Sequence, residues 1–350
     1  MKQGTGRTVI TGGAGFIGTN VADRLLRAGR SVVVLDDLSR PGVRRNLRWL
    51  REQHPGRLTI SEGDVRDRST VRAALRVAER VFHFAAQVAV TTSVTDPRHD
   101  FAVNLAGTLN VLEELRRLDR PVPLLFTSTN KVYGGLEDVE VTDAAGRYEP
   151  SDPQLRRHGI SERRPLDFCS PYGCSKGGAD QYVLDYAKSY GLPTVVFRMS
   201  CIYGLHQQGN EDQGWVAHFA KQALANEPIT LYGDGRQVRD VLFIDDLVEA
   251  MLLATGDIER FRGQAFNLGG GPDNAVSLLE VIEMVSAFTG AKPRLEFGDW
   301  RVGDQRWYVS DTRRFQQVSG WSTKVDVKAG LERLVGWLQG ERHPLIAEVS

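Results

Sequence analysis

Residues 7–18 read Arg7-Thr8-Val9-Ile10-Thr11-Gly12-Gly13-Ala14-Gly15-Phe16-Ile17-Gly18. The first five are mostly β-branched and apolar, which predicts a buried strand, and a helical pattern at 19–28 follows the last glycine. In such a strand–turn–helix unit, Gly12 makes the tight turn, Gly15 lets backbone N–H groups approach a pyrophosphate, and Gly18 lets the helix pack closely on the strand. The phosphate charge is stabilised at the helix N-terminus. This run therefore predicts a dinucleotide-binding site.

A second apolar run, residues 31–35, ends in Asp36. A carboxylate at this position accepts hydrogen bonds from the ribose hydroxyls of an adenosine and repels a 2′-phosphate, so NAD is favoured over NADP. Arg40, Arg44 and Arg45 follow closely and offer the alternative, because arginines bind phosphate well. Otherwise these three arginines are solvated residues on a helix face. Asp36 and the glycines together predict NAD as the cofactor.

The composition excludes several classes of protein. The chain has 350 residues, and 44 Lys and Arg balance 44 Asp and Glu, so there is no overall field to attract nucleic acid or an anionic membrane. The cysteines Cys169, Cys174 and Cys201 form no CxxC pair of the kind that binds metal and leave an odd thiol. We find neither a signal-peptide pattern nor an apolar run long enough to span a bilayer. We therefore expect a cytoplasmic protein without a bound metal and without a nucleic-acid or membrane partner.

Apolar, strand-like runs alternate with helical patterns along much of the chain, and further strands are expected at 58–61, 80–85, 123–128 and 194–199. Such alternation predicts an α/β fold with a doubly wound parallel sheet. Asp64 follows the third strand, where it either meets the adenine or is an ordinary turn carboxylate. Phe84, Ala85 and Ala86 end the fourth strand, and the small alanines permit close approach of a flat ring.

Hydroxyl side chains end the fifth predicted strand, the last of them Thr129, at the sheet edge where ligands bind in this architecture. Downstream, Tyr172 and Lys176 are four residues apart and share one face of a helix. A tyrosine has a pKa of about 10, and a lysine ammonium and a nicotinamide cation nearby favour its phenolate. Tyr172 then acts as a general base, while Thr129 hydrogen-bonds the reacting oxygen. Without the dinucleotide motif, Tyr172 and Lys176 fit an ordinary amphipathic helix equally well.

With these motifs the chain resembles the extended short-chain dehydrogenase/reductase family, in its nucleotide-sugar epimerase and dehydratase group. The resemblance includes the later runs RQVRDV (236–241), DDL (245–247) and NLG (267–269). It implies a Rossmann domain at 1–200, to which 237–262 returns, and a smaller substrate-binding domain made of 201–236 and 263–340. It also implies a nucleoside diphosphate sugar in the cleft between them, and a homodimer or homotetramer that pairs through the helices after the fourth and fifth strands.

The resemblance carries over a set of candidate site residues. The predicted catalytic residues are Thr129, Tyr172 and Lys176. The predicted cofactor-binding residues are Gly12, Gly15, Phe16, Ile17, Gly18, Asp36, Asp37, Asp64, Val65, Phe84, Ala85, Ala86, Asn104, Tyr172, Lys176 and Ser200. The predicted substrate-binding residues are Thr129, Asn130, Cys201, Gln207, Gln213, Arg239 and Arg301. Arg239 and Arg301 hold the diphosphate by charge-assisted hydrogen bonds; the alternative is that they form ion pairs with Asp240 and Asp304.

The two residues after Thr129 bear on the reaction. Dehydratases of the family typically carry acidic residues there, whereas this chain has Asn130 and Lys131. Asn130 cannot act as an acid and a lysine replaces one poorly, so epimerisation is favoured over loss of water. The longer runs STNKVYG (128–134), LDFCSPYGCSK (166–176), DQGWV (212–216) and WRVGD (300–304) resemble the 2-epimerases of CDP-hexoses. The resemblance thus implies inversion at carbon 2 of a CDP-hexose through a transient 2-keto sugar.

Several alternatives stay open. Cys201 stands where 4-epimerases of the family use Asn, so the sugar itself is not fixed, and neither is the nucleotide base. The other candidate functions are a nucleotide-sugar 4-epimerase or 4,6-dehydratase of the same fold, and a non-catalytic redox-sensing module that binds NAD.

Overall fold

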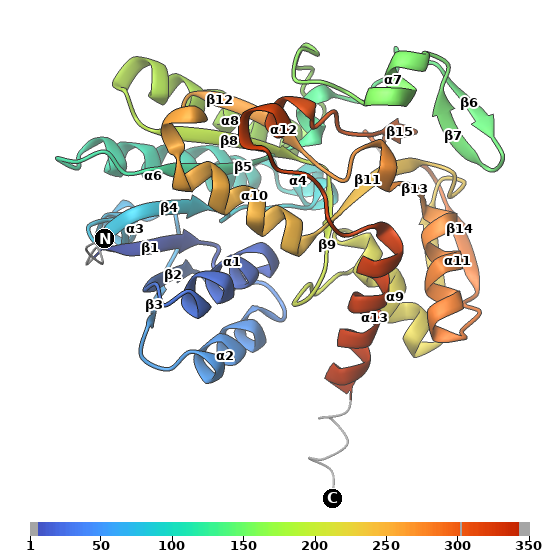
Figure 1. Ribbon diagram of the computed structural model, residues 1–350, viewed down its shortest axis with the longest axis horizontal. Helices are drawn as coiled ribbons and strands as arrows, with labels where there is room; N and C mark the ends of the chain where they lie inside the picture. Colours follow the sequence, from blue (N-terminus) through green and yellow to red (C-terminus); the bar gives the residue numbers. More distant parts are fainter. Residues whose placement is uncertain (1–5, 302, 343–350) are drawn as a thin grey trace, which may run out of the picture.

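A seven-stranded parallel sheet forms the centre of the computed structural model, which describes residues 6–301 and 303–342 (Figure 1). Its strands are β1 (Arg7–Thr11), β2 (Val32–Asp36), β3 (Leu58–Glu62), β4 (Ala78–His83), β5 (Leu124–Thr129), β8 (Thr194–Met199) and β12 (Gln264–Leu268). They lie in the order β12-β8-β5-β4-β1-β2-β3, and every neighbouring pair is parallel. The strand order reverses between β1 and β4, and the carboxyl ends of strands at such a point form a ligand-binding crevice. The predicted fold class is confirmed.

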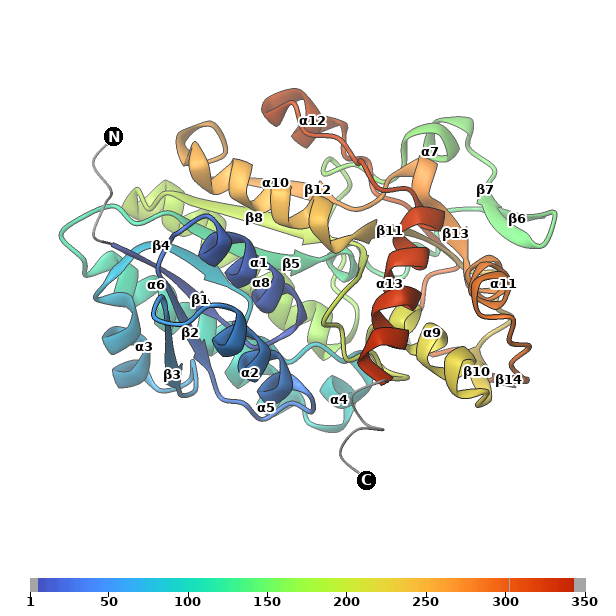
Figure 2. The same cartoon turned by 60° about the horizontal axis from the view of Figure 1, so that its bottom comes forward.

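Helices cover both faces of this sheet (Figures 1 and 2). One face carries α1 (Phe16–Arg27), α2 (Val43–Gln53) and α10 (Ile244–Gly256), and the other carries α3 (Arg68–Leu75), α6 (Gly107–Arg116) and α8 (Ser170–Tyr190). Successive side chains of a strand point to opposite faces. Ile10 of β1 accordingly belongs to the apolar core of the first face, and Val9 belongs to that of the second. Burial on both sides explains why the strands read as continuous apolar runs.

The remaining elements lie mostly beyond the carboxyl edge of the sheet. A second sheet contains β9 (Cys201–Tyr203), β11 (Val238–Phe243), β13 (Ala275–Ser277) and β15 (Trp307–Tyr308). Beside it, α9 (Trp215–Ala225), α11 (Leu278–Thr289) and α13 (Val327–Arg342) pack together, near the parallel pair β10 (Ile229–Tyr232) and β14 (Leu295–Gly298). The shorter elements are α4 (Val90–Thr95), α5 (Pro97–Phe101), a π-helix (Ala102–Ala106), a 3-10 turn (Asn130–Tyr133), β6 (Val141–Ala144), β7 (Arg147–Pro150), α7 (Pro153–His158), 3-10 turns at Ile258–Arg260 and Pro272–Asn274, and α12 (Arg313–Ser319).

Two strands, β11 and β12, join a different sheet from the one that the expected domain boundaries imply. The segment 237–262 was expected to return to the Rossmann domain, and its helix α10 does pack there, but its strand β11 pairs with β9, β13 and β15 of the second sheet. Conversely, β12 lies beyond the boundary at 263 and yet extends the large sheet, where it pairs with β8. Both strands are short and buried, so their sequence pattern does not predict which sheet they join.

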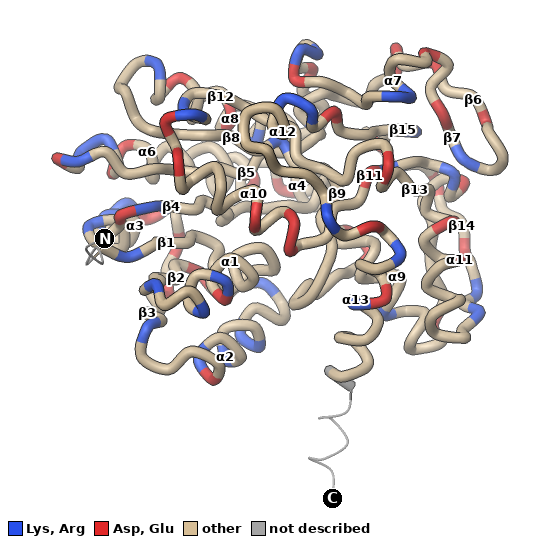
Figure 3. The backbone as a smooth tube through the Cα atoms, viewed as in Figure 1, with Lys and Arg blue, Asp and Glu red and all other residues tan. Residues whose placement is uncertain are grey.

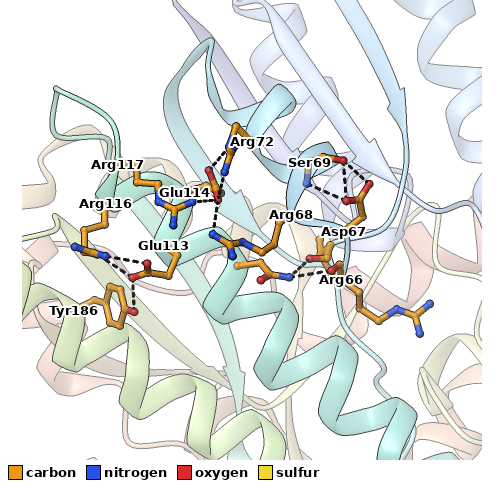
Figure 4. Close-up of polar contacts among 12 residues, drawn as sticks. Arg66, Asp67, Arg68, Ser69, Arg72, Glu113, Glu114, Arg116, Arg117 and Tyr186 are labelled. Carbon is orange, nitrogen blue, oxygen red and sulfur yellow. Dashed lines mark hydrogen bonds and ion pairs between the residues drawn. The ribbon is translucent and has the colours of Figure 1, made fainter.

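Charged residues of both signs are interspersed over the surface (Figure 3). One buried charge joins two helices: Glu114 of α6 is 3% exposed and accepts hydrogen bonds from Arg72 at 2.9 Å, Arg117 at 2.7 Å and Arg68 at 3.4 Å (Figure 4). The contacts from Arg68 and Arg72, both on α3, hold α3 against α6. Among the helices that the structure describes, none is both long and apolar enough to cross a membrane.

Candidate active site

A continuous cleft runs along the carboxyl edge of the large sheet. It consists of three connected cavities of about 330, 330 and 550 Å³. The first section shares Gly12 and Gly15 with the middle section, and the middle section shares Asn130 and Lys131 with the outer one. The cleft therefore has room for two ligands that meet in the middle section.

The glycine loop lies at the junction of the first and middle sections. Gly12 has a φ of +65°, and a Cβ there would lie 2.6 Å from the backbone nitrogen of Ala85. A Cβ on Gly18 would lie 2.5 Å from the carbonyl oxygen of Gly12, so only glycine allows α1 to approach the loop this closely. Gly15 is the N-cap residue of α1, and no side chain in the described ranges caps that end. The first-turn N–H groups thus suit a pyrophosphate.

Asp36 lines the first section at the end of β2. Its carboxylate accepts hydrogen bonds from the backbone N–H groups of Ala14 and Leu38, both at 2.9 Å. Burial raises its pKa, and these two hydrogen bonds oppose the rise. The carboxylate is therefore fixed in place by the backbone and still presents lone pairs to a ribose diol.

Most of the other predicted cofactor residues line the same two sections. Asp37, Asp64, Val65, Phe84, Ala85 and Ala86 line the first section, and Phe16, Ile17, Gly18 and Ser200 line the middle one, some of them both. Asn104 is different, because it is buried beneath the cleft. Its amide accepts from the Gln87 backbone N–H at 2.9 Å and donates to the Gln87 carbonyl at 3.0 Å. Asn104 thus holds the loop after β4 and does not face the cavity.

The three predicted catalytic residues meet in the middle section. Thr129 ends β5, while Tyr172 and Lys176 lie one turn apart on α8. Burial raises the pKa of Tyr172 to about 12, and a hydrogen bond from Thr129 opposes the rise. The charge of Arg40 also lowers this pKa, but the surrounding side chains do not produce the expected net lowering. A bound nicotinamide cation would add further positive charge. Burial lowers the pKa of Lys176 to about 7, against the attraction of Asp180 and Asp100.

Lys176 gives the fold a specific pH dependence. Its pKa is about 7 in the folded protein and 10.5 for an unperturbed lysine, so between these values the unfolded chain binds the proton that the native chain has released. We expect the free energy of unfolding, relative to Lys176→Met, to rise between pH 7 and 10 by on the order of 3 kcal/mol. Urea unfolding of both proteins without added NAD measures this difference. Parallel pH profiles for the two would contradict the prediction.

The predicted substrate residues lie along the middle and outer sections. Arg239 donates to Asp304 at 2.6 Å and to the carbonyl of Val238 at 2.8 Å. The Arg301 guanidinium stacks 3.7 Å from the Tyr232 ring centroid and also pairs with Asp212 at 3.2 Å. Both arginines line the outer section, so each of these ion pairs stands at the cleft itself.

The smaller polar residues differ in whether their polar atoms already have hydrogen-bond partners in the protein. The Asn130 amide donates to Gln305 at 3.2 Å, and the Cys201 thiol, whose pKa is raised by burial, accepts from Trp215 at 3.4 Å. Gln207 donates to the Ile202 carbonyl, and within the described residues its Oε1 has no partner. Gln213 accepts a hydrogen bond from Arg40. It therefore joins the loop before α9 to the loop after β2, over the cleft.

The sequence-based site set omitted several residues that line the outer section. These are Lys131, Tyr232, Gln237, Trp300 and Asp304. Tyr232 ends β10, and Trp300 lies two residues beyond β14. These two strands pair in parallel although they are far apart in the chain. A Cβ on Gly233 would lie 2.8 Å from the Trp300 ring. In the sequence, the glycine-rich turn after Tyr232 indicates that another part of the chain packs closely there. It does not indicate that this part is Trp300.

Comparison with known proteins places this geometry in a family. The family model described as the NAD dependent epimerase/dehydratase family matches residues 8–269. The chain belongs to this family. It is an NAD-dependent enzyme of the epimerase type, and NAD is the cofactor whose phosphates the glycine loop suits. The predicted resemblance is confirmed.

Individual relatives match over nearly the whole length. A CDP-paratose 2-epimerase of Salmonella typhi is 40% identical over 95% of this chain and 98% of its own. The structure of a UDP-glucose 4-epimerase of Thermus thermophilus in complex with NAD has a TM-score of 0.80 and 33% identity, covering 95% of this chain and 99% of its own. That of a UDP-glucose 4-epimerase of Thermotoga maritima with UDP-glucose has a TM-score of 0.81 and 28% identity, covering 96% and 99%.

Asp36 provides a test of cofactor binding. We expect Asp36→Ala to weaken NAD binding ~10- to 100-fold, because ribose hydroxyls lose a charged acceptor, and to reduce the preference for NAD over NADP. Glu62→Ala is the matched control, since Glu62 lies beside Asp36 on β3 but is not among the residues that line the cleft. Calorimetric titration with both cofactors measures the effect. Equal NAD affinities for the two variants would contradict the assignment.

Proposed function

We propose that the chain inverts carbon 2 of a CDP-hexose of the CDP-paratose/CDP-tyvelose type, through a transient 2-keto sugar. The observation that carries the proposal is the pair Asn130 and Lys131, which stands beside Thr129 in the cleft where a dehydratase needs acids. The 40% identity to the CDP-paratose 2-epimerase supports the choice of carbon and of nucleotide.

Each residue of the middle section has a role in this proposal. Tyr172 removes the proton of the carbon 2 hydroxyl while that carbon loses a hydride, and it returns the proton when hydride adds to the opposite face. Thr129 hydrogen-bonds the reacting oxygen, and the positive charge of a bound nicotinamide would favour the Tyr172 phenolate. NAD, when bound, supplies the hydride acceptor and donor, so the net reaction is an isomerisation.

The keto sugar must turn over between the two hydride transfers. Its diphosphate therefore needs an anchor separate from the chemistry. Arg239 and Arg301 supply that anchor from the outer section, whereas Thr129 and Tyr172 act in the middle section. Charge-assisted bonds of arginine to phosphate are strong enough to keep the nucleotide bound while the ring rotates.

The test is to incubate the purified protein, with no added cofactor, with CDP-, UDP-, GDP- and dTDP-hexoses and to follow the sugar ring by proton NMR. We expect inversion at carbon 2 of a CDP-hexose. Inversion at carbon 4 would favour the second candidate, a 4-epimerase, to which the two Thermus and Thermotoga structures point. A 4-keto-6-deoxy product would indicate a 4,6-dehydratase, and absence of any turnover would be expected of the redox-sensing module.

A further inference from the structure

Lys131 occupies a position between the two halves of the site. It lines the middle section with Thr129 and Tyr172, and it lines the outer section with Arg239 and Arg301. Its backbone belongs to the 3-10 turn that follows β5 directly, so it is fixed two residues from Thr129. Its side chain is half-buried, and none of the roles assigned in the proposed reaction falls to this cation.

The contacts of Lys131 leave part of its ammonium group free. Its Nζ donates to the carbonyl of Gly303 at 3.1 Å and lies 3.7 Å from Asp304, whose carboxylate also accepts from Arg239. An ammonium has three N–H donors, and these two partners, the ones found in the described residues, leave one donor. We call Lys131, Arg239 and Asp304 the Asp304 cluster. Two cations around one carboxylate give it a net positive charge, which suits an anion.

The chemistry of the substrate indicates where the anion must be. In a nucleoside diphosphate sugar the β-phosphate is attached to carbon 1 through oxygen. Carbon 2 is bonded to carbon 1, whereas carbon 4 lies across the ring. An enzyme that presents carbon 2 to Tyr172 must therefore hold the β-phosphate nearer to that tyrosine than an enzyme that presents carbon 4. Arg239 and Arg301 line only the outer section, while Lys131 also reaches the middle section.

We propose that Lys131 binds the β-phosphate of the nucleoside diphosphate sugar and so determines that carbon 2, and not carbon 4, faces the catalytic tyrosine. The choice of carbon rests on the proposed function; the phosphate contact rests on the Asp304 cluster alone. Asp304 positions both cations, since it touches Lys131 and Arg239 at once. Burial lowers the pKa of Lys131, as does the charge of Arg239, and the carboxylate of Asp304 opposes this lowering.

The test compares nucleoside diphosphates with monophosphates. The NAD-loaded protein is titrated calorimetrically with CDP and CMP, UDP and UMP, GDP and GMP, and dTDP and dTMP, and the pair that binds the wild type tightest is kept. We expect Lys131→Gln to weaken diphosphate binding ~10-fold or more and to change monophosphate binding less than ~2-fold, because only the contact to the β-phosphate is lost. Lys131→Arg keeps the charge and is expected to retain the diphosphate preference.

Controls separate a phosphate contact from a structural role. Lys131→Met is a second neutral variant. Lys324→Gln is a matched surface control, because Lys324 is exposed, pairs with Glu249 and is not among the residues that line the cleft. A neutral variant that weakens both members of the pair equally, or neither, overturns the proposal. If the wild type inverts carbon 2 while Lys131→Gln keeps its preference for the diphosphate, the role of Lys131 is wrong and the proposed function still holds. If carbon 2 is not inverted but the preference depends on Lys131, the phosphate contact stands and the proposed function fails.

Discussion

Tyr172→Phe is expected to lower kcat ~10³-fold, which is the contribution typical of a positioned general acid–base. The substitution removes one hydroxyl from a residue of the middle section and leaves the ring, its backbone bond from Tyr172 to Ser93, and the helix unchanged. NAD content, the affinity for a nucleoside diphosphate and the thermal unfolding temperature should therefore stay close to those of the wild type. The loss should appear in kcat and not in binding.

The same helix offers a matched control for this experiment. Tyr182 lies on α8 and is 45% exposed, away from the cleft residues, so Tyr182→Phe should retain wild-type turnover. Epimerisation of the sugar that responds in the NMR panel gives the rates. If Tyr172→Phe turned over within ~3-fold of the wild type, Tyr172 would not be the general base, since loss of such a group costs at least ~10²-fold.

Asp180→Asn is expected to destabilise the fold by about 3–5 kcal/mol, because it leaves a buried guanidinium without its counter-charge. Asp180 is fully buried on α8, and its carboxylate accepts two hydrogen bonds from Arg198 of β8, at 2.8 and 2.9 Å. Arg198 also donates to Tyr133 at 3.2 Å, which in turn donates to Asn267 of β12 at 2.8 Å. Burial lowers the pKa of Arg198, but the hydrogen bond and charge of Asp180 outweigh it, so the guanidinium stays charged.

Urea unfolding with Asp185→Asn as the control tests this expectation. Asp185 is exposed on the same helix, and the hydrogen bonds found for its carboxylate within the described part of the chain come from Ser189. Its substitution should therefore change the free energy of unfolding by less than ~0.5 kcal/mol. Asp180 also raises the pKa of Lys176, so Asp180→Asn should lower that pKa further. Equal stabilities for the two variants would show that the buried pair contributes little beyond an exposed carboxylate.

The sequence predicted those features that depend on local chain geometry. The left-handed backbone at Gly12 and the closeness of Gly18 to the loop follow from residue type and spacing. The parallel sheet follows from alternating strands and helices, because parallel strands require crossovers. The helix after the loop begins at Phe16, three residues before the predicted start at Thr19, since glycine has a low helix propensity and Gly18 obscured the pattern.

What the sequence missed depends on contacts between distant residues. The alternative for Arg239 and Arg301 was ion pairing with Asp240 and Asp304. Arg239 does pair with Asp304, but Arg301 pairs with Asp212, and Asp240 accepts from Ser200. Gln213 meets Arg40 across 173 positions of sequence. Spacing carries no information about such pairs. For the same reason, the sequence shows Lys131 only as a residue that stands where dehydratases carry an acid. Its contact with Asp304 is visible only in the folded structure.

In the proposed reaction, hydride leaves carbon 2 and returns to it, and a substrate deuterated at carbon 2 follows that transfer. The CDP-hexose is incubated in ordinary water with no added cofactor, and the product is examined by proton and deuterium NMR. We expect deuterium to be retained at carbon 2 of the inverted sugar, because the label returns from the cofactor to the same carbon. Inversion with loss of the label to solvent, or deuterium held at an unchanged carbon 2 while carbon 4 inverts, would contradict it.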